Sequence, residues 1–400
     1  MSRFLLNPVI AHLSETQVDE LVSRYYAGEN ITILLAEFKI GGKANTFSRH
    51  LPQRIHESSI CPACKAPMAS QMDPRSSARR SKQQSLFCSR CEHIDSPICR
   101  CAHCQSERQE AQSALLHEQQ KQIREYCRTE FETSAIWTIE NLSFSQAVSF
   151  LALVRTCELV DNGTCEPLAT STIPFAPEGE FGQELLAELA KAKLINISER
   201  SGIGAFSFAD GTVTSYQYDA VRWNLLCENV EHLIAEIENC GLIGEWPISW
   251  ASEVETLWMD LALAECKEYY AFCLRERGLP YTHGAKTDSM LRNLLRDQSV
   301  SQCYQIIWSG AKESADFLVR TKNSTRHAAN FMVGACQRWT GRARAEEWVV
   351  KNFRRNFHLP RSMVSYVLHD VMLKIGERGF TALIGISKLE DTYSNDPKPE

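Results

Sequence analysis

Seven cysteines between Cys61 and Cys104 are the residues whose type and spacing most directly suggest chemistry in this 400-residue chain. Six of them form three C-x-x-C pairs, and such a pair lets one tight turn present two thiolates to a single tetrahedral ion. This is the geometry of a zinc knuckle. Together with one nearby histidine, the cysteines predict two zinc ions. The eight candidate ligands are Cys61, Cys64, Cys88, Cys91, His93, Cys99, Cys101 and Cys104.

The spacing allows two ways to divide these ligands between two ions. In the sequential arrangement, one ion takes Cys61, Cys64, Cys88 and Cys91, and the other takes His93, Cys99, Cys101 and Cys104. In the interleaved arrangement, the first and third C-x-x-C pairs share one ion and enclose an inner site made by the other four ligands. In both, a closed shell of protein ligands leaves no open position for water, so the zinc is expected to be structural rather than catalytic.

Disulfide bonds are the alternative use of so many cysteines, and the expected compartment argues against them. The N-terminal stretch MSRFLLNPVIAHLSE has no pattern of a signal peptide, and no apolar run reaches the roughly 18 residues of a membrane span. We therefore expect a cytoplasmic protein without a membrane segment. Clustered cysteines in that compartment usually bind metal.

Charge is unevenly distributed along the chain, although the net charge of −6 excludes a uniformly basic coat. From Lys39 to Arg54 there are four basic residues and no acidic ones, whereas ten acidic residues and one lysine lie between Glu228 and Glu268. This asymmetry predicts a basic N-terminal end that suits a polyanion.

Three short helices are predicted in the first 52 residues. Ser14 and Asn30 are suited to cap the first two, each of which repeats apolar residues at helical spacing. The third buries Ala44, Phe47 and Leu51 and ends at the proline that follows. Its outer face is expected to carry Lys43, Asn45, Thr46, Arg49 and His50.

The string VDELVSRYYAGENITILLAEFKIGGKANTFSRHLP resembles the helix-turn-helix of Hin-type recombinases and transposases. The resemblance implies that the third helix reads bases in the major groove through Lys43, Asn45, Thr46 and Arg49, with His50 beside them. The alternative is a packing unit whose polar face is merely solvated. Cations of the insert within the cysteine region are candidate phosphate contacts, namely Arg75, Arg79, Arg80 and Lys82.

The fold class predicted for the chain is mainly α and multidomain. We expect a helix-turn-helix over residues 1–52, a zinc ribbon over 53–106 and a helical connector over 107–132. An α+β domain over 133–223 follows, whose helices, short strand and hairpin around Asp210 and Gly211 follow the order of a winged helix. A helical domain over 224–388 and a disordered tail over 389–400 complete the prediction.

A basic stretch near the C-terminus, QRWTGRARAEEWVVKNFRRNFHLPR, interleaves cations with aromatic residues. Such a pattern can hold a phosphate backbone. We favour the alternative, in which this stretch is helical and its basic face pairs with the acidic helices between Glu228 and Glu268.

The leading functional hypothesis is a zinc-containing, sequence-specific DNA-binding protein, a regulator or part of a bacterial mobile element or antiviral defence. Its helical half would bind a protein partner or a second copy. One alternative is a nucleic-acid-processing enzyme, for which Glu265 and Lys267 offer an E-x-K pair, although their helical periodicity does not suit a nuclease and no other catalytic motif is present. A protein-interaction scaffold is the third possibility.

Overall fold

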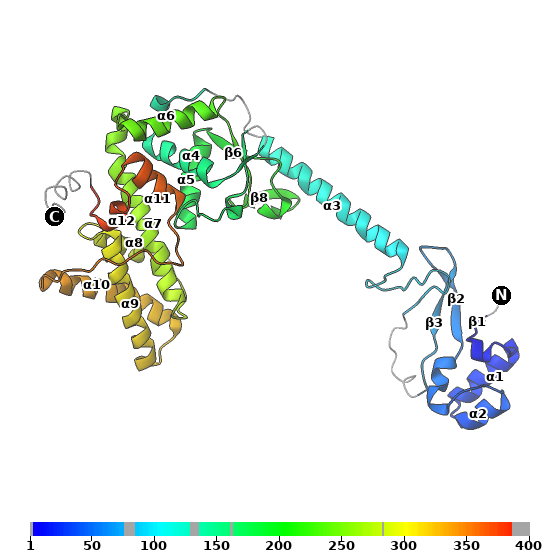
Figure 1. The fold of residues 1–400 in the computed structure, drawn as a ribbon. Helices are drawn as coiled ribbons and strands as arrows, with labels where there is room; N and C mark the ends of the chain where they lie inside the picture. The colour runs from blue at the N-terminus through cyan, green and yellow to red at the C-terminus, as the bar shows by residue number, and fades with distance from the viewer. Residues whose placement is uncertain (1–2, 76–84, 129–135, 161–162, 282–283, 386–400) are drawn as a thin grey trace, which may run out of the picture. The chain divides into compact units, whose positions relative to one another are not determined.

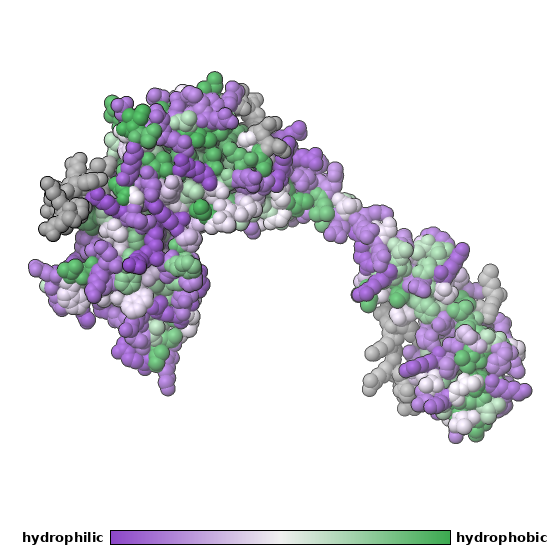
Figure 2. Space-filling model, in the orientation of Figure 1, coloured by the Kyte–Doolittle hydropathy of each residue, from purple (hydrophilic) through white to green (hydrophobic). Residues whose placement is uncertain are grey.

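The computed structural model describes residues 3–75, 85–128, 136–160, 163–281 and 284–385, and the chain divides into two compact units (Figure 1). The first unit comprises residues 1–118 and the second residues 119–400. The division falls within α3 (Ala102–Arg128), a helix whose surface is largely hydrophilic (Figure 2). The described ranges are mainly helical with small antiparallel sheets, which confirms the mainly α, multidomain prediction.

Two α-helices and a 3₁₀ helix build the apolar core at the start of the first unit. Helix α1 (Glu15–Tyr26) begins with a capping box in which Ser14 and Gln17 satisfy each other's backbone N–H groups, and Asn30 caps α2 (Ile31–Glu37). Fully buried Val18, Leu21 and Leu34 contribute to this core. A short 3₁₀ turn, η1 (Pro8–Ile10), precedes α1.

The third predicted helix is more tightly wound than expected, because Ala44–His50 forms a 3₁₀ helix, η2, instead of an α-helix. It starts after two glycines without a side-chain cap at Lys43, and Leu51 is extended with ψ 144° ahead of Pro52. A segment of seven residues between these limits gains little stability from extending an α-helix beyond its first turn. The predicted inward residues Phe47 and Leu51 are nevertheless buried.

A three-stranded antiparallel sheet links this core to the cysteine region. Its order is β1 (Phe4–Leu5), β2 (Gln53–Ile60), β3 (Pro67–Gln71). Met72, just after β3, packs into the helical core, and the Tyr26 hydroxyl donates to the Asp73 carbonyl at 2.5 Å. Strand β2 then runs directly into the first C-x-x-C pair.

In the second unit, a small antiparallel sheet packs with two helices, α4 (Phe144–Thr156) and α5 (Gly179–Lys191). Its strand order is β4 (Leu159–Val160), β5 (Thr164–Cys165), β9 (Trp223–Leu225), β6 (Ile195–Ile197). The predicted hairpin forms separately as β7 (Phe206–Ala209) and β8 (Thr212–Tyr216), with positive φ at Asp210 and Gly211. Single 3₁₀ turns are η3 (Ile139–Asn141), η4 (Leu168–Thr170) and η5 (Ile203–Ala205).

The remaining chain is helical, and one continuous apolar core joins it to the sheet region. The elements are α6 (Val230–Ile243), η6 (Ile248–Ser252), α7 (Val254–Arg275), α8 (Ala285–Leu294), α9 (Val300–Thr321), α10 (Thr325–Ala345), α11 (Met363–Tyr366), the π-helical turn η7 (Val367–Met372) and α12 (Arg378–Thr381). Among the described residues, no helix is both long and apolar enough to span a bilayer.

Candidate metal centres

Two hairpin tips present the first four cysteines. The first tip, Cys61 to Ala66, lies between the paired residues Ile60 and Pro67 at the end of β2 and β3. The second tip, Cys88 to His93, lies between Phe87 and Ile94, which form a bridge of their own. Phe87 also bridges to Ala69 on β3, so the two tips belong to one small sheet and face each other.

The two tips have the same backbone conformation. In each, the N–H of the residue after the second cysteine donates to the carbonyl of the first: Lys65 to Cys61 and Glu92 to Cys88, both at 3.0 Å. Lys65 and Glu92 have φ of 60° and 58°, the left-handed region that usually favours glycine. This turn directs both sulfur atoms of a tip to the same side.

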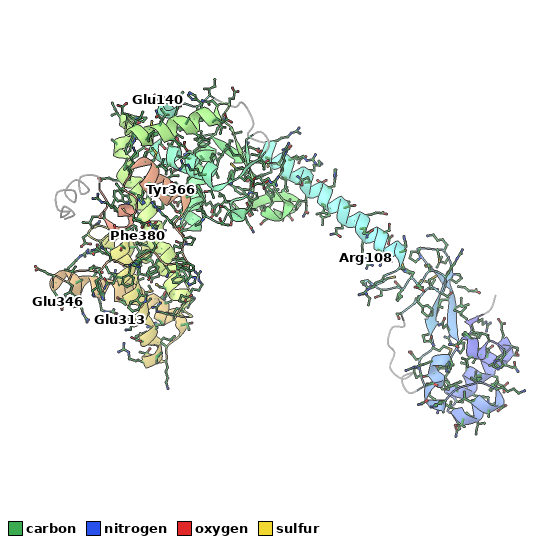
Figure 3. The ribbon with its side chains drawn as sticks, viewed as in Figure 1. Arg108, Glu140, Glu313, Glu346, Tyr366 and Phe380 are labelled. Atoms are coloured by element: carbon green, nitrogen blue, oxygen red, sulfur yellow. The ribbon has the colours of Figure 1, made fainter. Side chains whose placement is uncertain are left out.

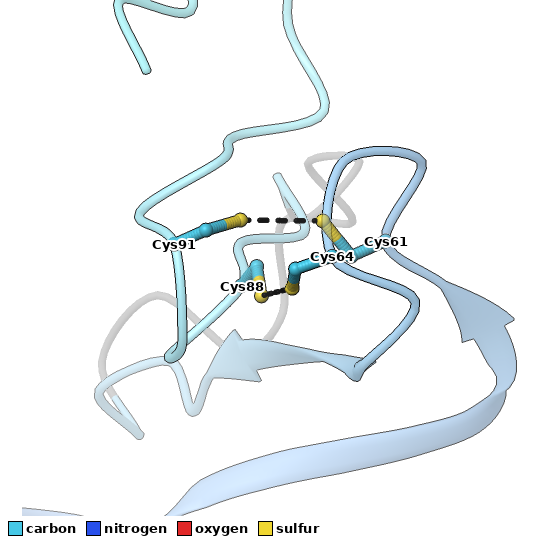
Figure 4. A group of neighbouring side chains, drawn as sticks. All are labelled: Cys61, Cys64, Cys88 and Cys91. Carbon is cyan, nitrogen blue, oxygen red and sulfur yellow. Dashed lines mark hydrogen bonds between the residues drawn. The ribbon is translucent and has the colours of Figure 1, made fainter. Parts of the chain in front are cut away.

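The sulfur atoms of the first centre converge on one point (Figure 4). Cys61 Sγ lies 3.5 Å from Cys91 Sγ, and Cys64 Sγ lies 3.3 Å from Cys88 Sγ, so each contact joins one tip to the other. These separations are too long for a disulfide, whose sulfur atoms lie about 2.05 Å apart. They approach the roughly 3.8 Å edge of a tetrahedron with metal–sulfur bonds of about 2.3 Å.

The second centre gathers three cysteines around one histidine nitrogen. His93 Nδ1 lies 3.7 Å from Cys99 Sγ, 3.5 Å from Cys101 Sγ and 3.3 Å from Cys104 Sγ. His93 is buried, with 7% of its surface exposed. All ligand atoms of this set lie within 4.8 Å of one another, as do those of the first set.

Helix α3 supplies the last ligands of the second centre. It starts directly after Cys101, so Cys104 stands on its first turn, where burial and the thiols of Cys101 and Cys99 raise the pKa of Cys104 to about 12. Arg108, one turn further on and labelled in Figure 3, donates to the carbonyl oxygens of Pro97 and Cys99. This side chain holds the loop before α3 against the helix.

Without a cation, the thiols of each set cannot all ionise. Burial opposes ionisation of Cys88, yet backbone N–H groups and neighbouring thiols lower its pKa to about 7. In the same set, a backbone hydrogen bond favours ionisation of Cys91, but burial and the other three thiols raise its pKa to about 12. A bound cation removes this conflict by compensating the mutual repulsion of the thiolates.

The residues of both centres therefore fit two metal ions, each with four soft or borderline donors in a closed tetrahedral set. The structure forms the sequential arrangement of the ligands and not the interleaved one. All eight predicted ligands belong to one of the two sets. When bound, such an ion cross-links loops rather than offering an open position for a reaction.

The predicted DNA-contacting residues of the N-terminal helices lie on or beside η2. Lys43, Asn45 and Arg49 are exposed, whereas the Thr46 hydroxyl donates to the Lys43 carbonyl at 2.9 Å. The Nδ1 atom of His50 is buried and has no hydrogen-bond partner within the described residues.

Of the four predicted phosphate contacts, Arg75 is the one that lies within the described residues. Arg75 binds within the unit: its Nη1 donates to the Glu29 carbonyl at 2.7 Å, and its guanidinium lies 5.4 Å from the centre of the Tyr25 ring. Arg79, Arg80 and Lys82 lie outside the described residues, as does the tail after residue 385.

Glu265 and Lys267, the E-x-K pair of the enzyme alternative, point to different partners. Glu265 is buried on α7 and forms a 2.8 Å ion pair with Arg355, while Lys267 lies 3.5 Å from Asp288 and 3.8 Å from Glu180. The two side chains therefore do not face a common point, as the E-x-K pair of a metal-dependent nuclease must.

The residues that support the ligands were not predicted from the sequence. Arg108 follows Cys104 at the i+4 position of a helix, which is the only signal for its role. Lys65 and Glu92 gave no signal, since neither residue type favours a left-handed conformation. Searches against models of protein families, curated proteins and solved structures each returned no match to this chain.

Proposed function

We propose that the first unit is a DNA-binding module stabilised by two zinc ions. The two closed sets of four ligands carry this proposal, because such sets cross-link small modules that lack a large apolar core of their own. Zinc is the ion that best suits four thiolates, or three thiolates and one imidazole, in tetrahedral geometry.

The contact surface that we propose for DNA is the exposed side of η2, with Lys43, Asn45 and Arg49 reaching base edges. The resemblance to the helix-turn-helix of Hin-type recombinases supports this assignment. So do helices α1 and α2, which have N-cap residues and precede η2 in the chain. Because η2 has only seven residues, we expect a short recognition sequence.

The division of charge between the units supports the same assignment. Residues 1–118 contain 14 Lys and Arg against 12 Asp and Glu, whereas residues 119–400 contain 29 against 37. The first unit is thus the one that a polyanion attracts over long distances.

For the second unit we propose a protein partner or a second copy. The order of its predicted elements is that of a winged helix, but the hairpin β7-β8 pairs apart from the sheet β4-β5-β9-β6, and the exposed side of α5 carries Gln183, Glu184 and Glu188. Carboxylates on the helix that would enter the groove repel phosphate. We therefore assign this region to protein contacts.

The proposal is tested by duplex binding of the full-length, metal-loaded protein. Arg49→Ala and Asn45→Ala should each weaken binding to a selected site by about 1 to 3 kcal/mol, or roughly five- to 150-fold, since each removes one base contact. Fluorescence anisotropy against site and scrambled duplexes measures both affinity and preference.

Arg296→Ala is the matched control, because it removes the same charge from an exposed residue of the second unit. It should leave site preference unchanged. If Arg49→Ala binds as this control does, or if the wild-type protein shows no salt-sensitive duplex binding at about 50 mM salt, the DNA-binding proposal is wrong.

A further inference from the structure

A segment without helix or strand connects α10 to α11 in the second unit. We call residues 346–362 the strap. The basic, aromatic stretch recognised in the sequence lies on α10 and the strap. The predicted helix ends at Ala345, and no second helix begins until Met363.

Inward-facing residues fix the strap to α7 and α9. The Phe353 N–H donates to the Ser301 carbonyl at 3.2 Å, and the Ser301 hydroxyl donates back to the Phe353 carbonyl at 2.6 Å. Two residues further on, Arg355 forms its buried ion pair with Glu265. The strap is therefore a defined surface rather than a loose connection.

The outward-facing residues are apolar or basic. Val349 and Phe357 are 89% and 94% exposed, and Trp348 is 45% exposed. Lys351 and Arg354 lie between them in the sequence and are exposed as well. Aromatic rings at such exposure, alternating with cations, have no role in the core of this unit.

This surface is basic within an acidic unit. Residues 320–361 contain ten Lys and Arg against two Glu, although acidic residues outnumber basic ones over residues 119–400. The contrast gives this part of the second unit a local positive potential.

Part of the basic stretch is already neutralised. Arg338 pairs with Glu313 on α9 (labelled in Figure 3), Arg344 with Asp297, and both distances are 2.8 Å. Arg361 pairs with Asp370. The sequence predicts that these cations pair with the acidic region between Glu228 and Glu268. Among them, only Arg355 has its partner there.

Lys351 and Arg354 differ from these paired cations. Across the described ranges, no carboxylate lies within 4.0 Å of either one. They can bind an external anion without first breaking an internal ion pair.

Aromatic rings at the end of the strap form a ladder that reaches the surface. The Phe357 and His358 ring centres lie 5.6 Å apart, and His358 stacks on Phe272 of α7 at 6.1 Å. The Arg275 guanidinium lies 5.9 Å from the Phe272 ring centre. Phe357 is the exposed end of this ladder.

We propose that the strap binds single-stranded nucleic acid, with Phe357 stacking on a base and Lys351 and Arg354 contacting phosphates. A single strand offers unpaired bases to an exposed ring, whereas the bases of a duplex are stacked inside it. From Trp348 to Phe357 the backbone spans at most about 30 Å at 3.3 Å per residue, which accommodates several nucleotides. The proposal does not depend on duplex binding by the first unit.

Binding of a labelled, mixed-sequence single strand of about 12 nucleotides to the full-length protein tests this assignment. Phe357→Ala should weaken binding roughly five- to 100-fold, because stacking on one base is lost. Ile248→Ala is the matched control: Ile248 is an apolar residue of the same unit, is 96% exposed, and lies outside the strap. Its affinity should equal that of the wild type.

The double variant Lys351→Ala, Arg354→Ala should reduce the slope of log affinity against log salt by about 1.4, or about 0.7 for each phosphate contact. A control that removes two exposed cations elsewhere, Lys191→Ala with Arg200→Ala, should leave the slope unchanged. Duplex affinity, measured in parallel with Arg49→Ala, reports on the first unit separately.

Three results would overturn the assignment to single strands. One is the absence of single-strand binding by the wild type at low salt, and another is a Phe357→Ala variant that binds as the Ile248→Ala control does. The third is equally tight binding of a polyglutamate chain without dependence on Phe357, which would identify an acidic protein as the partner.

Discussion

Cys104 is the ligand whose replacement separates the two centres most cleanly. It stands on α3 rather than on a hairpin tip, and its sulfur contacts only the second set. Cys104→Ser should reduce the metal content from two ions per chain to one, since the first set keeps all four sulfur atoms. Metal analysis of purified protein measures the ratio.

Cys240→Ser serves as its control, because Cys240 is a partly exposed cysteine outside both sets. It should retain two ions. A wild-type protein without bound metal, or a Cys104→Ser variant with the wild-type ratio, would contradict the assignment of the second centre.

Glu268 on α7 gives the stability of the second unit a dependence on pH. Burial and the charge of Glu265 raise its pKa to about 8, despite the opposing effect of Arg355. The folded state thus keeps a proton that the unfolded state loses near the ordinary pKa of 4.5. Stability should fall as pH rises from 4.5 to 8 and then level off.

Between pH 6 and pH 8, the expected loss is about 1 to 3 kcal/mol in the free energy of unfolding. Glu268→Gln, which cannot ionise, should remove most of this slope. Denaturant unfolding of both proteins at the two pH values measures the difference, and parallel curves for wild type and variant would refute the role of Glu268.

The identity of the ligands was predictable from the sequence, but their partition was not. C-x-x-C pairs are recognisable in a sequence because one turn must present two sulfur atoms to the same ion. Which pairs share an ion depends on how the hairpin tips face each other, and Phe87 settles this by bridging to both Ala69 and Ile94. Nothing in the spacing encodes that contact.

At the scale of elements, α6 and the π-helical turn η7 approach each other closely in the second unit. A Cβ atom at Gly241 would lie 2.5 Å from the carbonyl oxygen of Val371, which is backbone and cannot rotate away. Gly241→Ala should therefore lower the free energy of unfolding by about 1 to 3 kcal/mol.

Gly341 on α10 provides the opposite case. A Cβ atom there meets nothing within 4 Å, so Gly341→Ala should stabilise the unit by about 0.5 to 1 kcal/mol through helix propensity. Thermal unfolding of the two variants beside wild type measures both effects. A Gly241→Ala variant as stable as the wild type would show that the α6 and η7 backbones are not in close contact.

Elements with strong local signals were predictable, and those defined by distant pairing were not. Apolar residues at helical spacing predict helices over 143–157 and 300–319, and α4 and α9 match these ranges closely. In the structure, Ser143 and Ser299 each form a capping box ahead of an apolar stripe. Strands β4, β5 and β9 have two or three residues and no measurable alternation. Only pairing with other segments makes them strands: Trp223 pairs with Cys165 and Ile197, and Leu159 pairs with Cys165.

The whole molecule combines two units with different sources of stability. The second unit has a single extensive apolar core, whereas the cysteine region of the first unit buries little more than Cys61, Met68 and Cys88. Small modules of that kind depend on cross-links. Functions that need metal are therefore expected in the first unit, and those that need a rigid surface in the second.

The positions of strand β2 and the second hairpin tip imply that the two metal ions bind in a fixed order. His93 closes the same tip that holds Cys88 and Cys91, so the second set is complete only after the first has formed its turn. The first set requires nothing from α3. Loading should therefore be ordered: under zinc starvation, chains would hold no ion, the first alone or both, and chains with only the second would be rare.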